Sequence, residues 1–382
     1  MKRVRKMKLK EIMKQLPEGY KEACWETKAM MRKKGIQDEE KLLILCLYYA
    51  YDHSLVEVQN YAKKFLSVDI SDVGFMKRFI RCNEWIKWIN EHMAADEQQI
   101  YQKPEQLKDY CVLAIDASDI VSKGAAKQIW RLHYAVNLFT MNSEMFKITS
   151  EKTGESLKNF ELQPKDLVLA DRIYATITGM EHCRKAGADF ILRLRNKAFK
   201  LYDSEGSEII LSDLLKNTDM TAQDHYVFYL NSQKELKPIR ICAVQKTDDE
   251  KKFEQEKIRQ KESKKQIKLS EETKFTHNYF FVVTSLDETF TAEQILALYR
   301  LRWQVEMVFK RFKSILNMGS IPTKTEASGK AWLNCKMLIA LITEKLLSKV
   351  DFSPYQCSKE HLEGDENVIP FDFSLFFDCE EF

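Results

Sequence analysis

The sequence predicts a protein of the α/β class that has an all-helical N-terminal region and a β-rich insertion. Early in the chain, apolar residues recur at helical spacing, and glycine and proline are scarce. After Pro104, short apolar runs typical of buried strands alternate with helical stretches. A segment of short strands, turns and charged residues interrupts this alternation once. We therefore expect an all-helical region at 1–100, an α/β core at 105–195 and 276–350, an inserted β-rich segment with a charged linker at 196–275, and an acidic tail at 351–382.

Composition favours an intracellular globular protein. The chain has 382 residues, of which 45% are hydrophobic and 31% charged, so more than one folding unit is expected and disorder is not. Its nine cysteines never form a C-x-x-C pair, which argues against a structural zinc site and suits a reducing compartment. The longest apolar run, Leu42 to Tyr51, is half of what a bilayer requires, and no signal-peptide core follows the N-terminus. We expect a cytoplasmic protein with no membrane partner.

Charge is distributed unevenly along the chain. The formal net charge of +3 is too small to indicate a nucleic-acid partner by itself, because the clustering of charges decides phosphate binding. Residues 1–34 are rich in lysine and arginine, whereas residues 351–382 are rich in aspartate and glutamate. A basic head and an acidic tail therefore nearly cancel.

Two short helices are predicted in the helical region. Ser54 begins the first with a capping box, and a turn follows at 67–70. Ser71 begins the second, which carries Lys77, Arg78 and Arg81. This is the pattern of a helix-turn-helix DNA-binding unit, and a plain helical hairpin is the alternative.

The α/β core is predicted from a series of apolar runs. The run from Tyr110 to Ile115 is typical of a buried strand that ends at Asp116, and a second buried strand, 166–170, ends at Asp171. The charged run 246–274 predicts a solvated helix or a mobile linker. The remaining predicted elements are strands at 128–139, 145–150, 189–195 and 278–284 and helices at 176–186, 292–315 and 330–350.

A helical stripe of polar groups near the end of the core is the sharpest feature of the sequence. At roughly 100° per residue, four polar side chains fall on one narrow face of a helix, and four apolar ones fall on the opposite face. The polar set is Tyr299, Arg302, Glu306 and Lys313, and the apolar set is Leu301, Val305, Val308 and Phe312. Such a helix can pack on a sheet while its polar face lines a cleft. A surface helix with ordinary ion pairs has the same spacing.

Asp116, Asp171 and Glu306 together indicate phosphoryl chemistry that uses two metal ions. Hard divalent ions about 4 Å apart need carboxylate oxygens that converge from different chain segments. Two strand ends and one helix supply such segments. Either aspartate alone is more simply explained as a carboxylate that caps a turn, so the prediction depends on all three residues.

The string Y-x2-R-x3-E-x6-K, formed by Tyr299, Arg302, Glu306 and Lys313, resembles the signature of DDE transposases of the insertion-sequence-4 family. The segments Leu113-Ala-Ile-Asp-Ala-Ser and Leu169-Ala-Asp-Arg-Ile-Tyr resemble the first and second acidic motifs of that family. The long gap between Asp171 and Glu306 leaves room for the β-strand insertion found in similar members. The resemblance covers roughly residues 40–345.

This resemblance implies a ribonuclease-H-like core in which Asp116, Asp171 and Glu306 are catalytic and hold two Mg²⁺ ions, with Mn²⁺ as a substitute. It also implies a transposase that cleaves insertion-sequence ends and joins them to target DNA. The partners would be double-stranded DNA, with terminal inverted repeats, and a second copy of the chain as a homodimer at the nucleoid. The residues expected to contact DNA are Tyr299, Arg302, Lys313, Arg172, Arg193, Arg195 and Trp303.

Two other functions stay open at this point. The chain could be a catalytically silent DNA-binding protein derived from a transposase, or a metal-dependent nuclease that does not transpose. The sequence also departs from relatives that use a DNA hairpin, because no tryptophan lies between Trp130 and Trp303 to stack a flipped base. Tyr226, Phe228 and Tyr229 are the substitutes that the inserted segment offers.

Overall fold

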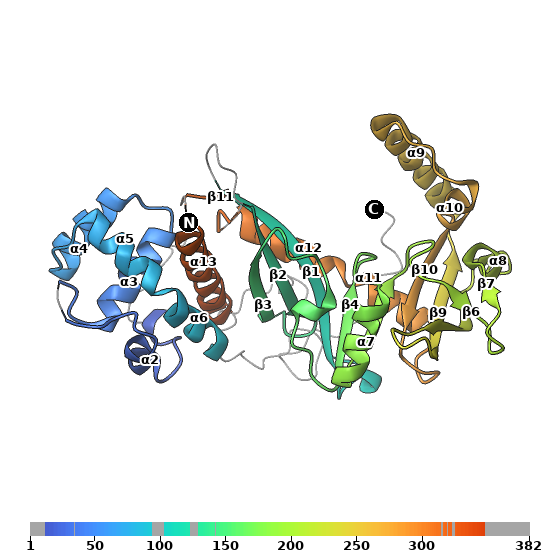
Figure 1. Ribbon diagram of the computed structural model, residues 1–382, viewed down its shortest axis with the longest axis horizontal. Coiled ribbons are helices and arrows are strands. Elements are labelled where there is room, and N and C mark those ends of the chain that lie inside the picture. Colours follow the sequence, from blue (N-terminus) through green and yellow to red (C-terminus); the bar gives the residue numbers. More distant parts are fainter. Residues whose placement is uncertain are drawn as a thin grey trace, which may run out of the picture.

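The computed structural model describes residues 12–33, 35–93, 103–122, 129–141, 143–314, 316–318, 320–322 and 325–347. The predicted acidic tail and residues 1–11 of the predicted basic head lie outside the described residues. The described part of the chain is elongated (Figure 1). The N-terminal helices form one end, a large sheet occupies the middle, and the inserted segment forms the other end.

The N-terminal helices begin where the sequence predicts. Ser54 caps α4 through a capping box with Glu57, and the Ser71 hydroxyl accepts a hydrogen bond from the Gly74 amide at the start of α5. Both helices of the predicted helix-turn-helix are therefore present, and their role in DNA binding stays a prediction. The helices of this region are α2 (Tyr20–Glu26), α3 (Glu39–Ala50), α4 (Leu55–Leu66), α5 (Asp72–Arg81) and α6 (Asn83–His92).

One mixed sheet runs through the middle and far end of the molecule in the order β3-β2-β1-β4-β5-β10-β9-β8-β6-β7, and β11 also pairs with β1. Strands β1, β4 and β5 are parallel to one another, whereas β2, β3 and β10 join as antiparallel partners. The inserted strands therefore extend the same sheet. The strands are β1 (Cys111–Ser122), β2 (Ile129–Asn137), β3 (Ser143–Ser150), β4 (Asp166–Ala170), β5 (Asp189–Arg193), β6 (Leu201–Tyr202), β7 (Glu208–Ile209), β8 (Gln223–Leu230), β9 (Leu236–Gln245), β10 (Tyr279–Thr284) and β11 (Ser320–Ile321).

The prediction that the first strand ends at Asp116 is wrong. Strand β1 continues to Ser122, because its pairing with β2 runs past Asp116, from Ala117 opposite His133 to Val121 opposite Ile129. The apolar run of the sequence ends at Asp116, but the hydrogen-bonded pairing of β1 with β2 continues beyond it. A polar side chain in the middle of a strand can face a site, and sequence patterning alone cannot separate that case from a strand end.

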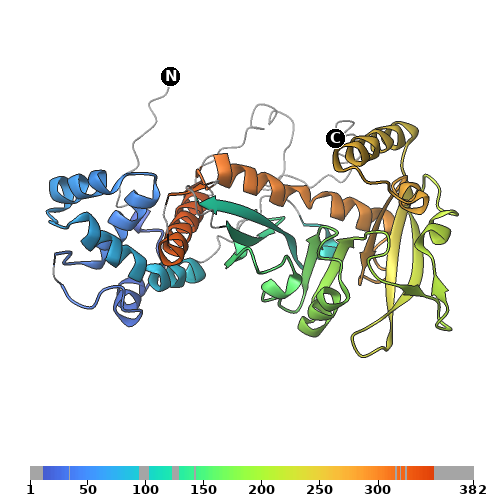
Figure 2. The same cartoon turned by 45° about the horizontal axis from the view of Figure 1, so that its top comes forward.

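Helices cover both faces of the sheet. Helices α11 (Ala292–Arg300) and α12 (Trp303–Ser314) lie along one face, with α12 against β1 and β2 and α11 against β5, β8, β9 and β10 (Figure 2). Helix α7 (Ile177–Ala186), which lies where a helix was predicted and is capped by Thr176, packs against β5, on whose other face α11 lies. Short 3₁₀ turns, η1 (Glu105–Leu107) and η2 (Leu157–Asn159), precede β1 and β4.

Helix α13 (Glu326–Leu347) connects the N-terminal helices to the sheet. It contacts α3, α5 and α6 on one side and β3 and β11 on the other. The buried Lys336 Nζ binds Asp52 Oδ2 at 2.9 Å, which fixes α13 to the end of α3. The helix begins earlier than the predicted Lys330, because Thr325 caps it through the Ser328 amide.

The single helix predicted at 292–315 is instead two consecutive helices. Leu301 and Arg302 separate α11 from α12. Their amides donate to the carbonyls three residues earlier, Leu298 and Tyr299, both at 3.0 Å. Side chains three residues apart eclipse in such a turn, so Tyr299, although buried, stays beside Arg302, whose guanidinium carbon lies 5.9 Å from the centre of the Tyr299 ring. The predicted apolar face is confirmed, since all four of its side chains are buried.

The charged run in the insertion forms a solvated helix, which was one of the two predicted alternatives. Helix α9 (Asp248–Lys265) buries only Ile258 and is followed by α10 (Glu271–Thr276). A short helix, α8 (Leu211–Leu215), joins β7 to β8. Among the described residues, no helix combines the length and the apolar character needed to cross a membrane.

Candidate active site

Parallel pairing of β1 with β4 places Asp116 next to Asp171. Ile115 pairs with Ala170 at the end of the ladder, so the residues that follow are neighbours. Strand β4 ends there, and the Tyr174 amide donates to the Asp171 carbonyl at 2.9 Å to close the next turn. Two acidic residues that are far apart in the sequence are therefore neighbours at the carboxyl end of β4.

Asp116 has an unusual environment for a carboxylate. It is half-buried, and its Oδ1 accepts a hydrogen bond from the adjacent Ala117 amide at 2.8 Å. Burial raises the pKa of Asp116 to about 6, an effect that Ala117 and the Arg302 guanidinium oppose and Glu306 reinforces. The side chain therefore interacts electrostatically with both Arg302 and Glu306 on the helical face of the sheet.

Glu306 lies in the first turn of α12, which packs on β1 and β2. Arg302 Nη2 donates to Glu306 Oε1 at 2.6 Å, and the Glu306 side chain is 50% exposed whereas Arg302 is 15% exposed. Arg302 Nε is buried and has no hydrogen-bond partner among the described residues. The Arg302–Glu306 pair thus places an accessible carboxylate, that of Glu306, beside a buried donor without an acceptor, the Nε of Arg302.

The three predicted metal ligands approach one another without forming a closed cage. Asp116 and Asp171 are neighbours, and Glu306 faces Arg302. In the described part of the chain, no three His, Cys, Asp or Glu side chains are close enough to hold one ion together. Three carboxylates are suitable ligands for a hard divalent ion, and Glu306 would have to turn away from Arg302 to join the aspartates.

Three of the predicted DNA-contacting residues surround this group. Tyr299 is buried, and burial raises its pKa to about 12. The Arg193 guanidinium lies 4.5 Å from the centre of the Phe280 ring, and burial lowers the pKa of Arg193. Arg172 Nε lies 3.7 Å from Asp171 Oδ1 in a half-exposed ion pair. Tyr299, Arg193 and Arg172 are therefore close to Asp116 and Asp171, and each of them already makes contacts within the protein.

The other predicted DNA contacts are farther along their elements. Arg195 is exposed just beyond β5, and Lys313 is exposed near the end of α12, about two turns after Glu306. Trp303 is partly exposed at the first position of α12. Their roles stay predictions.

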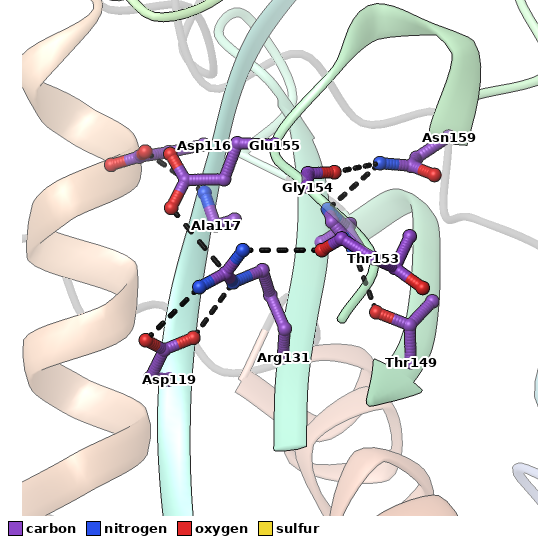
Figure 3. A network of polar contacts seen from close by, with 10 residues as sticks. Asp116, Ala117, Asp119, Arg131, Thr149, Thr153, Gly154, Glu155 and Asn159 are labelled. Atoms are coloured by element: carbon purple, nitrogen blue, oxygen red, sulfur yellow. Dashed lines mark hydrogen bonds and ion pairs between the residues drawn. The ribbon is translucent and has the colours of Figure 1, made fainter. Parts of the chain in front are cut away.

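Sequence reasoning missed two residues at this site. Glu155 lies in the loop after β3, and Figure 3 shows its side chain next to that of Asp116. Tyr174 is buried three residues after Asp171, with Asp116 and Glu155 among its charged neighbours. Tyr174 is the last residue of the motif Leu169-Ala-Asp-Arg-Ile-Tyr, so the sequence does contain a signal for it. Glu155 has no spacing signal, because only the folded loop brings it to the site.

Known proteins resemble most of this chain. The family described as "Transposase DDE domain" matches residues 107–342, more than half of the sequence. The putative transposase InsL for insertion sequence element IS186A of Escherichia coli (strain K12) is 24% identical over 353 residues, covering 90% of this chain and 95% of that protein. The transposase for insertion sequence element IS421 of Escherichia coli is 24% identical over 354 residues, with coverage of 90% and 95%.

A third relative matches a shorter part. The transposase for insertion sequence element IS1151 of Clostridium perfringens is 27% identical over 187 residues, covering 44% of this chain and 38% of that protein. The family match spans β1, β4 and α12, the elements that carry the acidic side chains. On this match, the chain belongs to the family of proteins with a transposase DDE domain.

Proposed function

We propose that this protein is an insertion-sequence transposase whose Asp116, Asp171 and Glu306 are the catalytic carboxylates. The single observation that carries the proposal is the parallel register of β1 and β4, which makes two distant aspartates neighbours beside the helix that bears Glu306. The names of the relatives support the same function, since each is a transposase for an insertion sequence.

The proposal includes a ribonuclease-H-like core formed by β1 to β5. The order β3-β2-β1-β4-β5, with an antiparallel three-strand meander and then two parallel strands, supports it. It also includes membership of the insertion-sequence-4 family, on the grounds of the Tyr299, Arg302, Glu306 and Lys313 signature. The strands inserted between β5 and β10 fit the long interval before Glu306.

Divalent cations are the cofactors that this set of residues suits. Asp116, Asp171 and Glu306 would hold Mg²⁺, or Mn²⁺ in its place, and the ions would supply activation of the attacking oxygen and stabilisation of the leaving one. Glu306 joins this set once it separates from Arg302. The half-exposed state of Glu306 leaves it room to move.

Arg302 has a second task in this proposal. Its Nε is a buried donor without a partner among the described residues, and such a donor is satisfied when an acceptor oxygen arrives. A DNA phosphate supplies that oxygen. Release of Glu306 and capture of a phosphate therefore belong to one rearrangement of Arg302, which couples DNA binding to assembly of the carboxylates.

The wider DNA interface extends along α12 and β5. Lys313, Arg172, Arg193 and Arg195 would contact backbone phosphates, with Trp303 available for stacking. Two copies of the chain would bring two transposon ends together.

The test is metal-dependent nicking of a duplex that carries the inverted repeats flanking the coding region. Asp116→Asn, Asp171→Asn and Glu306→Gln should each reduce nicking in Mg²⁺ to background while binding the duplex like the unmodified protein. Glu293→Gln is the matched control, because Glu293 occupies the first turn of α11 as Glu306 does in α12 and is exposed. Retained nicking in any of the three variants would remove the mechanism. A pre-nicked end supplied with target DNA separates a transposase, which joins them, from a nuclease, which does not.

A further inference from the structure

A loop between β3 and η2 brings an additional carboxylate to the Asp116–Asp171 pair. Glu155 belongs to this loop, and its side chain is 24% exposed. Figure 3 shows it next to Asp116, and it interacts electrostatically with both Asp116 and Asp171. Glu155 therefore faces the same space as the two aspartates, although it comes from a different segment of the chain.

Backbone contacts fix the loop that carries Glu155. Arg131 Nη1 donates to the Thr153 carbonyl at 3.1 Å, and Asn159 Nδ2 donates to the Gly154 carbonyl at 2.9 Å. The Glu151 amide also donates to the Ile129 carbonyl at 3.2 Å. These three hydrogen bonds attach the backbone of the loop to β2 and η2. The position of Glu155 is therefore fixed before any ligand binds.

Arg131 orients Glu155 without neutralising it. The Arg131 guanidinium makes a bidentate contact with Asp119, at 2.7 and 3.2 Å, and its Nε is 3.9 Å from Glu155 Oε1. Arg131 therefore forms its closer ion pair with Asp119, and the Glu155 carboxylate remains available to bind a cation. Burial and the neighbouring Asp119 and Asp171 raise the pKa of Glu155, which Arg131 opposes.

Tyr174 gives an independent indication that a ligand belongs in this space. Its side chain is fully buried, and its hydroxyl has no hydrogen-bond partner among the described residues. Its charged neighbours are Asp116, Glu155, Arg131 and Asp171, so the hydroxyl lies within electrostatic reach of the acidic group. Burial and Asp116 raise its pKa, so it stays a donor. A buried donor that lacks an acceptor is costly and is usually satisfied by a bound group or a reoriented neighbour.

We propose that Glu155 is a fourth carboxylate of the divalent-cation site and that Tyr174 is the positioning residue that orients this carboxylate and Asp116. The inference rests on the proposed function, because it adds a ligand to the site of Asp116 and Asp171. Glu155 supplies an acidic oxygen from the side opposite α12, whereas Glu306 supplies one from α12 itself. Three acidic residues therefore remain for the site while Glu306 is paired with Arg302, and their side chains have to converge to hold one ion.

This arrangement has a consequence for the order of events. Once their side chains converge, Asp116, Asp171 and Glu155 can bind a first cation before DNA arrives, since none of them depends on the release of Glu306. Binding of Mn²⁺ by the DNA-free protein should accordingly depend on Glu155 more than on Glu306.

The test is isothermal titration of the full-length, DNA-free protein with Mn²⁺. Glu155→Gln should weaken Mn²⁺ binding about tenfold or more, in the range known for residues that support a metal site. Tyr174→Phe, which removes only the hydroxyl, should weaken it several-fold. Glu151→Gln is the matched control, because Glu151 is an exposed glutamate of the same loop, and it should leave the affinity unchanged. Melting temperatures without Mn²⁺ establish that each variant is folded.

Asp116→Asn in the same titration separates the two proposals. If Asp116→Asn weakens Mn²⁺ binding and Glu155→Gln and Tyr174→Phe do not, the inference about Glu155 and Tyr174 is overturned and the proposed function stands. If Asp116→Asn leaves Mn²⁺ binding unchanged, the proposed function itself fails. Should Glu155→Gln melt earlier than Glu151→Gln without Mn²⁺, Tyr174→Phe decides the matter, and an unchanged affinity in that variant overturns the inference.

Discussion

The half of the sheet that carries Asp116 and the half formed by the inserted strands satisfy their buried charges differently. In the inserted half, Arg240 is 4% exposed, its Nε donates to Asp224 Oδ1 at 2.7 Å and its Nη1 to the Asp287 carbonyl at 2.5 Å. In the other half, Arg302 Nη2 donates to Glu306 Oε1 at 2.6 Å, and its buried Nε has no acceptor among the described residues. Complete pairing indicates a structural role, whereas an unused buried donor indicates that a ligand completes the set.

The pKa values of two carboxyl groups, Asp116 in one half and Glu254 in the other, differ in the same way. Burial raises the pKa of Asp116 to about 6, so the fold opposes its charge. In the inserted half, a hydrogen bond with His277, followed by Lys246 and Lys257, lowers the pKa of Glu254 to about 2. The fold therefore stabilises the charged form of Glu254. The charged form of Asp116 would instead be stabilised by a bound ligand.

The largest effect is expected from Arg302→Gln. If its Nε and Nη groups contact a phosphate and release Glu306, the variant should lose about 100-fold to 1000-fold in nicking rate, the usual effect of removing one aligned donor. Its free energy of unfolding should change little, because the ion pair with half-exposed Glu306 contributes little. Rates of nicking and urea unfolding curves measure the two quantities. A variant that nicks normally would show that the unused donor has no role.

Arg240→Gln should show the reverse pattern. It leaves Asp224 without its partner in a buried contact, so we expect a loss of about 3 kcal/mol in the free energy of unfolding. The folded variant should nick at the normal rate. A loss of nicking without a loss of stability would contradict the structural role assigned to Arg240.

The pH dependence of stability should have opposite signs for Asp116 and Glu254. The Asp116 pKa rises on folding from 3.8 to about 6, so the native state holds the proton longer and stability falls as pH increases through this window. Relative to Asp116→Asn, the unmodified protein should lose on the order of 2 kcal/mol between pH 4 and pH 6.5.

For Glu254 the native pKa is below the usual value of 4.5, at about 2. Its contribution is present above pH 4.5 and is lost as pH falls towards 2. Relative to Glu254→Gln, the unmodified protein should therefore be more stable at neutral pH by on the order of 2 kcal/mol, with the advantage shrinking in acid. Urea unfolding across pH checks both signs, and equal slopes for the two pairs would contradict the comparison.

The smallest effect is expected on the surface of α9. Lys252 Nζ binds Asp249 Oδ1 at 3.2 Å, and both side chains are almost fully exposed. Lys252→Ala should change the free energy of unfolding by less than about 0.5 kcal/mol. A larger change would show that α9 packs against something in solution.

Local patterns predicted the elements well where the signal lies within a few residues. The Ser54 capping box and the buried strand before Asp171 are present at the predicted places, and the helix predicted at 176–186 is α7. The break after Leu301 could not be predicted, because helical spacing continues across it and only the hydrogen bonds of the turn distinguish the two cases. Periodicity therefore located the elements and missed the boundary between α11 and α12.

The candidate site was predicted only in the parts that motifs contain. Asp116, Asp171 and Glu306 follow from strand ends and a helical signature, and the structure makes the two aspartates neighbours. Glu155 and its connection through Arg131 depend on contacts between β2 and a distant loop, which no local pattern encodes. The pairing of Glu306 with Arg302 was equally hidden, because the same spacing suits an ion pair or two separate ligands.

The most direct test of the central claim is the anomalous scattering of Mn²⁺ in crystals of the full-length protein bound to a transposon end. We expect a Mn²⁺ peak coordinated by Asp116 and Asp171, with Glu306 turned from Arg302 towards the ion. Mn²⁺ found elsewhere, or ions at this place that Asp116 and Asp171 do not touch, would contradict the account.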